Sequence, residues 1–382
     1  MTGVPVLADV ATPALLVEYP VLLSNVREMA RRASGLGVGL WPHAKTHKTP
    51  QVAALQREHG AAGVTVATVA EGEAMVRHGA QDVLVAYPPV GAWRMEALVR
   101  LAARARLRVV VDDIAVLRAV EDACRRAGVS AGYLWEVDCG AGRLGTEPGG
   151  VTAGLVAQAG SSRWMSFDGL MTFAGHVYHA GTPEEVAAIA ADEAGAVLST
   201  AADLAGRGIE ARALSTGTTP TAHHMRQQRG ITEARPGNYV FHDATQVALG
   251  VATQAQCALS VLATVIGRPG PRRIILDAGS KALAADRMTP LTPGFGIIPG
   301  HPGLTVDQLY EEHAIVASAE PTGIGVGTRL RVVPNHACAV ANLHREMHVV
   351  DGLPDGTADG TLDGTVVADV WPVVATRAGS QP

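Results

Sequence analysis

The segment PHAKTHK, residues 42–48, places a lysine between two histidines directly after a short apolar run. A lysine that is held near other cations or partly removed from water has a lowered pKa and becomes nucleophilic. Such an amine can form a Schiff base with a carbonyl compound. Lys45 is therefore a candidate for covalent chemistry. The alternative is a surface loop in which the same residues are simply solvated.

Two glycine-containing turns form a second candidate site. They are LSTGTTPT, residues 214–221, and RPGNYVF, residues 235–241. Backbone N–H groups of such turns can bind a phosphate, and barrels often hold one after their seventh and eighth strands. Each turn taken alone also resembles an ordinary loop, so its position in the fold has to support the interpretation.

The segment VVPNHACA, residues 332–339, brings an imidazole and a thiol two positions apart. On an extended segment, side chains at i and i+2 point to the same side, so His336 and Cys338 could bind one metal ion. Two ligands are too few for a closed structural zinc site but leave positions open for water or substrate. The alternative is a buried cysteine near a hydrogen-bonded histidine.

The elements that must position these residues are short β-branched runs alternating with helical patterns. Val, Leu and Ala recur at helical spacing in EGEAMVRHGA, residues 71–80, and in DIAVLRAVEDACRRAG, residues 113–128. Eight strands separated mostly by connections of helix length predict a (β/α)8 TIM-type barrel. The eight strands are expected to begin near Val38, Gly63, Asp82, Leu107, Tyr133, Phe167, Arg212 and Ala234.

After about residue 250 the pattern changes to strand-like runs punctuated by glycine and proline. These runs are CALSVLATVIGR (257–268), RRIILDAGS (272–280), GTRLRVVPN (327–335) and REMHVVDG (345–352). They predict a mainly antiparallel β domain. We therefore expect a barrel over residues 12–250, and a β domain over 251–382, together with 1–11, that carries His336 and Cys338.

Composition narrows the functional class. The net charge of −5 offers no basic surplus to neutralise nucleic-acid phosphates. No apolar run reaches the ~18 residues that a membrane span needs, and the first residues lack the pattern of a signal peptide. The four cysteines are scattered without a CxxC pair. These features predict a cytoplasmic protein without nucleic-acid or membrane partners.

Taken together, these motifs resemble the fold-type III pyridoxal phosphate enzymes. They are most similar to the D-serine dehydratase and D-threonine aldolase branch, which has an alanine racemase-like N-terminal domain. The matching segments are PHAKTHKTP, EVDCGAGRLG, FAGHVYH, STGTTPT, RPGNYVF and PNHACA. They occur in the order of the family, between about residue 10 and residue 345, and cover most of the chain.

The resemblance implies a role for each matching residue. Lys45 is expected to form the Schiff base with pyridoxal 5′-phosphate, and Arg143 to lie near the cofactor ring and its phenolic oxygen. His179 matches the base that acts on the substrate hydroxyl in the aldolases. His336 and Cys338 are expected to bind a divalent metal; a thiolate favours zinc, with manganese or magnesium as alternatives. The expected phosphate-binding residues are Ser215, Thr216, Gly217, Gly237, Asn238 and Tyr239.

Two positions bear on which reaction the resemblance implies. Phe173 stands where the family usually has a tyrosine, so it keeps the packing surface without the hydroxyl. Cys338 matches the dehydratases, whereas aldolases tend to carry aspartate there. The resemblance thus implies a dimeric lyase that eliminates water from D-3-hydroxy amino acids to give a 2-keto acid and ammonia. Retro-aldol cleavage to glycine and an aldehyde is the alternative, followed by a racemase or a pyridoxal phosphate carrier.

Overall fold

The computed structural model describes residues 5–353 and 362–374, and its contacts divide the chain into two compact units. The β unit comprises Met1–Val26, Tyr178–Thr182 and Asn238–Val373, and the barrel unit comprises Arg27–Val177, Pro183–Gly237 and Val374–Pro382. The boundaries expected at residues 12 and 250 differ from these. The segments before Arg27 and from Asn238 to Val373 both belong to the β unit.

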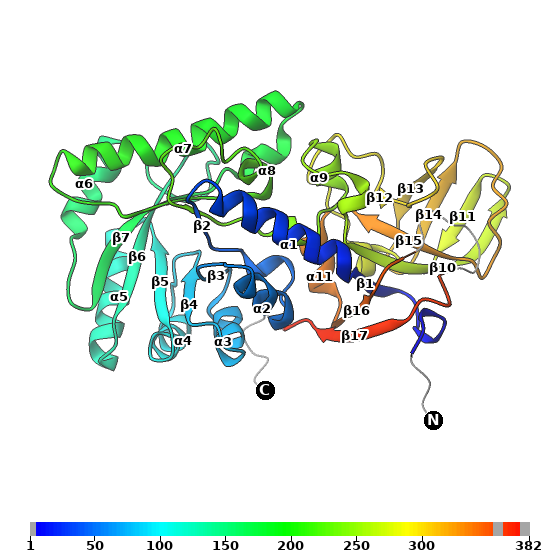
Figure 1. The fold of residues 1–382 in the computed structure, drawn as a ribbon, viewed down its shortest axis with the longest axis horizontal. Coiled ribbons are helices and arrows are strands. Elements are labelled where there is room, and N and C mark those ends of the chain that lie inside the picture. The colour runs from blue at the N-terminus through cyan, green and yellow to red at the C-terminus, as the bar shows by residue number, and fades with distance from the viewer. Residues whose placement is uncertain (1–4, 354–361, 375–382) are drawn as a thin grey trace. The chain divides into compact units, whose positions relative to one another are not determined.

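Eight parallel strands form the centre of the barrel unit, in the order β2-β9-β8-β7-β6-β5-β4-β3. Figure 1 shows β3 to β7 of this sheet with the helices of the unit around them. The N–H of Ala62 donates to Leu40 O at 2.8 Å, and that of Thr65 donates to Pro42 O at 2.9 Å, which joins the first and last strands. The predicted (β/α)8 barrel is therefore confirmed. The strands are β2 (Gly39–Leu40), β3 (Val64–Val66), β4 (Asp82–Val85), β5 (Arg106–Val111), β6 (Ala131–Val137), β7 (Met165–Thr172), β8 (Ala213–Thr216) and β9 (Glu233–Ala234).

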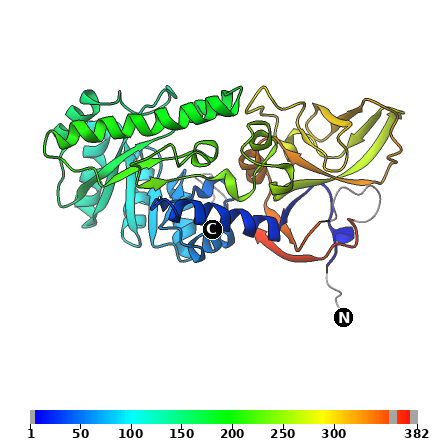
Figure 2. The same cartoon turned by 45° about the horizontal axis from the view of Figure 1, so that its top comes forward.

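Helices connect these strands, as parallel neighbours require. The two helical patterns recognised in the sequence fold as α3 and α5. Figure 2 shows the long helix α7 running alongside the strands of the barrel unit. The helices are α1 (Tyr19–Ser34), which contains the unit boundary, α2 (Pro50–Glu58), α3 (Val69–Arg77), α4 (Ala92–Ala102), α5 (Ile114–Ala127), α6 (Gly150–Ala159), α7 (Pro183–Ala205) and α8 (Thr219–Ala222).

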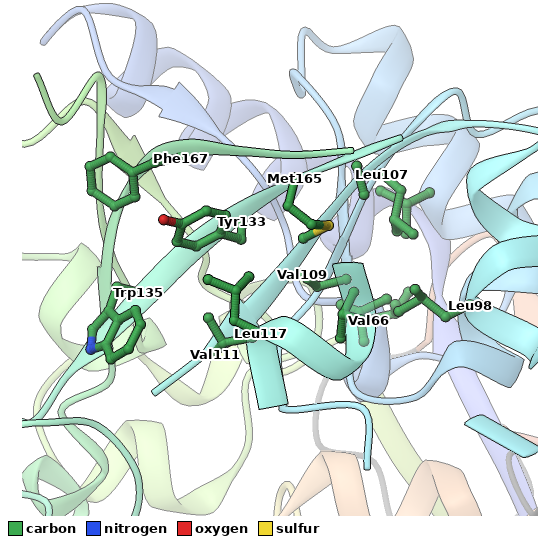
Figure 3. Close-up of a cluster of buried hydrophobic side chains, with 14 of the residues drawn as sticks. Val66, Leu98, Leu107, Val109, Val111, Leu117, Tyr133, Trp135, Met165 and Phe167 are labelled. Carbon is green, nitrogen blue, oxygen red and sulfur yellow. The ribbon is translucent and has the colours of Figure 1, made fainter. Parts of the chain in front are cut away.

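Side chains alternate between the two faces of the barrel strands, because successive residues of a strand point to opposite sides. Leu107, Val109 and Val111 of β5 share one buried cluster with Leu117 of α5, and Figure 3 shows this layer between strands and helices. Val110 of the same strand belongs to a second cluster inside the barrel. That inner cluster consists of Leu84, Val110, Leu134, Met171 and Ala213.

The β unit contains the second sheet, ordered β13-β14-β11-β10-β1-β16-β17, with β15 pairing with both β10 and β12. All its pairs are antiparallel except β1 with β16, so the predicted mainly antiparallel domain is confirmed. Strand β1, at Ala14–Glu18, was not expected there. The other strands are β10 (Leu259–Gly270), β11 (Arg273–Leu276), β12 (Gly296–Ile297), β13 (Leu304–Leu309), β14 (Ala314–Ser318), β15 (Arg329–Pro334), β16 (Glu346–Val350) and β17 (Val367–Pro372).

Short helices complete the β unit: α9 (Ala244–Ala248), α10 (Ser280–Leu283) and α11 (Ala337–Leu343). Single 3-10 turns occur at Leu7–Asp9, Ala44–Thr46, Gly175–His179, Asn238–Val240 and Gln254–Gln256. Within residues 5–353 and 362–374, no helix has the length and apolar character needed to cross a membrane.

A glycine substitution tests the packing of the barrel strands. Gly169 of β7 has φ +153°, and a Cβ there would lie 2.0 Å from Ala213 O of β8. We expect Gly169→Ala to lower the free energy of unfolding by about 3 kcal/mol, since neither backbone can move aside without loss of strand pairing. Gly154 in α6 is the control, because nothing lies within 4 Å of its Cβ position. There alanine should stabilise by roughly 0.5–1 kcal/mol. Denaturant unfolding of both variants makes the comparison, and a tolerated Gly169→Ala would contradict the strand packing.

Candidate active site

Lys45 lies in the 3-10 turn Ala44–Thr46 that follows β2, at the C-terminal end of the barrel strands. His43 caps this turn, because its Nδ1 accepts a hydrogen bond from the Lys45 N–H at 3.4 Å. Pro50 then begins α2 at a position where a missing N–H costs nothing. The nearby Lys48 ammonium is 3.8 Å from the buried Glu71 carboxylate. Lys45, in contrast, lines a cavity next to this turn.

That cavity has a volume of about 280 Å³, and all its lining residues belong to the barrel unit. This is close to the lower end of the ~300–1,000 Å³ typical of small-molecule sites. Lys45, Arg143 and Arg235 supply three cationic side chains to it. The complete lining is His43, Lys45, Ala67, Ala86, Tyr87, Arg143, Leu144, Met171, Phe173, Gly217 and Arg235.

Burial, together with these cations, keeps His43 uncharged. Burial, followed by repulsion from Lys45 and Arg235, lowers the pKa of His43 well below its usual value. The neutral ring can accept the Lys45 N–H without adding another positive charge to the cavity. A cavity with this cationic excess fits an anionic ligand.

The Phe173 ring contacts two of these cations, Arg143 and Lys45. The Arg143 guanidinium lies 4.4 Å from the ring centroid, and Lys45 Nζ lies 5.4 Å away. Both distances are within the range of cation–π attraction. The aromatic position that differs from the family thus contacts the two residues expected to approach the cofactor, although it offers them no hydroxyl.

The loop after β6 positions Arg143. The Asp138 carboxylate accepts hydrogen bonds from the N–H groups of Gly140, Ala141 and Gly142 at 2.9–3.2 Å. Gly140 and Gly142 adopt φ of +109° and +62°, which glycine takes up at little cost. The acidic-glycine-arginine motif is therefore a local turn that carries the guanidinium to the cavity.

Glu136 precedes this loop on β6 and points to the barrel interior, on the same face as Leu134. Its side chain is 2% exposed, Oε1 is 3.8 Å from Arg143 Nη2, and Oε2 is buried with no hydrogen-bond partner in the described chain. Burial raises its pKa to about 7, although Arg143 and Arg235 oppose this change. Sequence reasoning missed this carboxyl. The pattern that could have revealed it is a charged residue on the inward face of an otherwise apolar, buried strand.

Arg235 was also missed, although it begins the RPGNYVF turn. The side chain is 3% exposed, and its guanidinium donates to Ser215 Oγ and to Thr172 O, both at 2.5 Å. Burial lowers its pKa to about 10, while Glu193, Glu136 and Glu233 oppose the shift. It therefore remains charged near neutral pH and links the ends of β7 and β8.

The two turns expected to hold phosphate lie at the ends of β8 and β9. Ser215 points into the barrel toward Arg235, whereas Thr216 points outward and donates to Gln228 Oε1 at 3.3 Å. The Gly217 N–H donates to Glu193 Oε1 at 3.0 Å. These groups already have protein partners. That they bind phosphate directly stays a prediction.

Close packing explains both glycines of these turns. A Cβ at Gly217 would lie 2.8 Å from the backbone N of Arg235. A Cβ at Gly237 would lie 2.6 Å from Thr46 Oγ1 and 3.0 Å from His43 O. The turn after β9 therefore passes directly against the segment that carries Lys45, which only glycine permits.

Asn238 and Tyr239 follow Gly237 in the chain and belong to the β unit, where both are buried. Asn238 Nδ2 donates to Asp243 Oδ2 at 2.5 Å, and the same carboxylate oxygen accepts the Ala337 N–H at 2.9 Å. Asp243 thus ties the Asn238 turn to the first residue of α11. Burial raises the pKa of this carboxyl.

His336 and Cys338 lie at this end of α11, but the segment is not extended as expected. His336 is the extended residue before the helix, and Cys338 is already inside its first turn. The two side chains still interact with each other, and His336 Nδ1 also contacts Asp286 Oδ2. Burial opposes protonation, but Cys338, Asp286 and Asp243 together raise the pKa of His336 to about 11.

The side chains around His336, which are Cys338, Asp286 and Asp243, are rich in negative charge and fit a divalent cation. Across residues 5–353 and 362–374, no three His, Cys, Asp or Glu side chains form a complete metal-binding cluster. A metal held by His336 and Cys338 would therefore take its remaining ligands from water or substrate, as catalytic sites do. His179 ends the 3-10 turn Gly175–His179 and is exposed. His179 lies in the β unit, whereas the residues that line the cavity belong to the barrel unit. Its expected role as a base therefore stays a prediction.

The comparisons with known proteins define the class to which this barrel and its cationic cavity belong. Residues 18–245, more than half of the chain, match the alanine racemase N-terminal domain, and residues 258–350 match a putative serine dehydratase domain. The chain belongs to the fold-type III pyridoxal phosphate enzymes, in the branch with a serine dehydratase-like β domain. It is thus a pyridoxal phosphate-dependent lyase, and the resemblance expected from the sequence is confirmed.

Among the relatives, D-threo-3-hydroxyaspartate dehydratase of Delftia sp. (strain HT23) is 34% identical over 86% of this chain and 91% of its own. D-threonine aldolase of Arthrobacter sp. is also 34% identical, over 97% of this chain and 93% of its own. A solved structure of a cysteine-to-alanine mutant of D-threo-3-hydroxyaspartate dehydratase, described as the metal-free form, has a TM-score of 0.86 at 29% identity. It covers 98% of this chain and is itself covered completely.

The pH dependence of stability tests the buried carboxyl of Glu136. Its folded-state pKa of about 7 lies above its ordinary value of 4.5, so between these pH values the folded protein binds more protons than the unfolded chain. Stability contributed by this group is therefore present at low pH and is lost as pH rises through that window. We expect Glu136→Gln, which does not titrate, to lose less unfolding free energy than wild type between about pH 5 and about pH 8. Denaturant unfolding of both cofactor-free proteins measures this, and identical losses would contradict the raised pKa.

Proposed function

We propose that this lyase uses pyridoxal 5′-phosphate and a divalent metal to remove water from D-3-hydroxy amino acids, giving a 2-keto acid and ammonia. The observation that carries the proposal is the convergence of Lys45, Arg143 and Arg235 on one cavity at the C-terminal end of the barrel. Active sites of such barrels lie at this end. The relatives named as dehydratases and aldolases support the substrate class.

Lys45 would hold the cofactor covalently, and the turns at Gly217 and at Gly237–Tyr239 would hold its phosphate. When bound, the cofactor withdraws electrons from the α-carbon of the substrate. Lys45 Nζ would then take the α-proton. The low pKa of His43 makes its ring a weak base, so it does not compete for the proton. Arg143, resting on the Phe173 ring, would face the cofactor ring.

The choice of dehydration over aldol cleavage rests on Cys338. A bound divalent metal would act as a Lewis acid toward the β-hydroxyl, and a thiolate ligand favours zinc. Aldol cleavage instead requires a base for the hydroxyl proton, and the exposed His179 is the candidate for that role. A racemase would have no use for His336 and Cys338. The homodimer implied by the family also stays a prediction, which the mass in solution would check.

Covalent attachment of the cofactor to Lys45 is the first prediction from this proposal. Borohydride reduction of the loaded protein should fix the cofactor on a single peptide that contains Lys45. The physical reason is that Lys45 lines the cavity, whereas Lys48 is paired with Glu71 and Lys281 is paired with Glu311. Peptide mass mapping locates the label. A label on Lys48 or Lys281 would refute the assignment.

Loss of the metal ligand is expected to stop elimination but not cofactor binding. Cys338→Ala should lower the rate of keto acid formation from D-serine, D-threonine and D-threo-3-hydroxyaspartate by at least about a hundredfold, since the leaving hydroxide loses its Lewis acid. The Lys45 label should persist. Chelator should reproduce the loss in wild type, and added zinc or manganese should reverse only the chelator effect.

Assays of both product pairs decide between the alternatives. Keto acid and ammonia support dehydration, whereas glycine and aldehyde support aldol cleavage. His179→Ala serves as the contrast, because elimination needs no base on the hydroxyl and should be affected less than aldol cleavage. Full activity after chelation would show that Cys338 is only a thiol in the β unit, and epimerisation alone would identify a racemase.

A further inference from the structure

Glu193 is a fully buried carboxylate on α7 for which the proposed chemistry has no use. It is 0% exposed, and every hydrogen bond recorded for its side chain comes from a buried donor of the barrel unit. Burying a carboxylate is costly unless it is completely hydrogen-bonded. A charge kept at such a cost requires a structural or functional reason, and its donors indicate which one.

Two of these donors belong to loops at the mouth of the barrel. Glu193 Oε1 accepts the Ala174 N–H at 3.1 Å and the Gly217 N–H at 3.0 Å. Ala174 directly follows Phe173, which lines the cavity, and Gly217 lines it as well. One carboxylate oxygen therefore holds the loops after β7 and β8 together from behind the cavity.

Gln228 completes the arrangement. Its Nε2 donates to Glu193 Oε2 at 2.9 Å and to Ala190 O at 3.1 Å, and its Oε1 accepts from Thr216 Oγ1 at 3.3 Å. Thr216 is the last residue of β8 before Gly217. The Glu193–Gln228 pair thus holds the turn through hydrogen bonds from the Thr216 side chain and from the Gly217 N–H.

We propose that Glu193, together with Gln228, is a positioning residue that fixes the turn Gly217–Thr219 in the shape that receives the cofactor phosphate. This rests on the proposed function. Because Glu193 takes the Gly217 N–H, that group is unavailable to the phosphate, and its effect is to orient the residues that follow. A turn fixed before binding loses less conformational entropy when the ligand arrives, which raises affinity.

The test is Glu193→Gln in the full-length chain, stripped of cofactor and titrated with pyridoxal phosphate and, separately, with pyridoxal. If its amide oxygen stays near Ala174 and Gly217, its NH₂ group meets the NH₂ of Gln228. If the amide is reversed, its NH₂ meets the two backbone N–H groups. In both cases a buried donor lacks an acceptor; if Gln228 reverses as well, its Oε1 faces Ala190 O, which loses its donor. Each arrangement costs about as much as a tenfold change in a binding constant. We expect affinity for pyridoxal phosphate to fall about tenfold and affinity for pyridoxal to change less than about twofold.

Two further variants separate positioning from general stability. Thr200→Val, on the same helix, removes a buried hydroxyl that accepts the Gly149 N–H at 2.8 Å, away from the cavity. It should lower thermal stability without changing either affinity. The swap Glu193→Gln with Gln228→Glu restores an amide–carboxylate pair, but it replaces the hydrogen bond to Ala190 O by a contact between two acceptor oxygens. It should recover part of the affinity for the phosphate form.

The outcomes distinguish this inference from the proposed function. If wild type binds pyridoxal phosphate but Glu193→Gln weakens both ligands equally, or Thr200→Val matches it, the positioning role is wrong. If wild type does not bind pyridoxal phosphate at all, the proposed function and this inference both fail. Should Glu193→Gln not fold, Glu193→Asp, which keeps the charge but shortens its reach, provides the same comparison with the same criteria.

Discussion

The guanidinium of Arg235 is buried where β7, β8 and β9 end, and burying its charge there is costly unless hydrogen bonds compensate for the lost water. Ser215 Oγ and Thr172 O accept its protons, and its backbone N–H donates to Thr216 O at 2.9 Å. The backbone of Arg235 also lies so close to Gly217 that no side chain fits there. This one buried cation therefore sets the spacing of the strand ends from which the cavity is built.

The acids around Arg235 decide the charge of that cavity. Glu136, Glu193 and Glu233 oppose the effect of burial on the arginine pKa. Glu136, however, is itself so buried that it is partly protonated near neutral pH, and Glu193 is occupied by loop N–H groups. The cavity consequently keeps an excess of positive charge from Lys45, Arg143 and Arg235. An anionic cofactor with a phosphate group matches this excess.

Each unit uses a buried carboxylate to hold the loops that carry its candidate functional residues. In the barrel unit Glu193 accepts N–H groups from the segments after β7 and β8. In the β unit Asp243 accepts from Asn238 and from the Ala337 N–H, between the expected metal ligands. Functional loops commonly have few contacts and low local stability. Here Glu193 and Asp243 hold the loops with fixed hydrogen bonds. Loops that are already in place before a ligand arrives favour its binding.

The sequence by itself determined the eight barrel strands, the mainly antiparallel second domain and the place of Lys45 after the first barrel strand. Apolar periodicity and glycine punctuation are local properties, so they can be read without the fold. Only the tertiary structure decided that β1 joins the second sheet, that Cys338 lies in a helix, and that Glu193 reaches Gly217. Contacts between residues far apart in the chain depend on strand register and helix packing, which no local pattern encodes. The raised pKa of Glu136 has the same origin, because burial is a property of the assembled barrel.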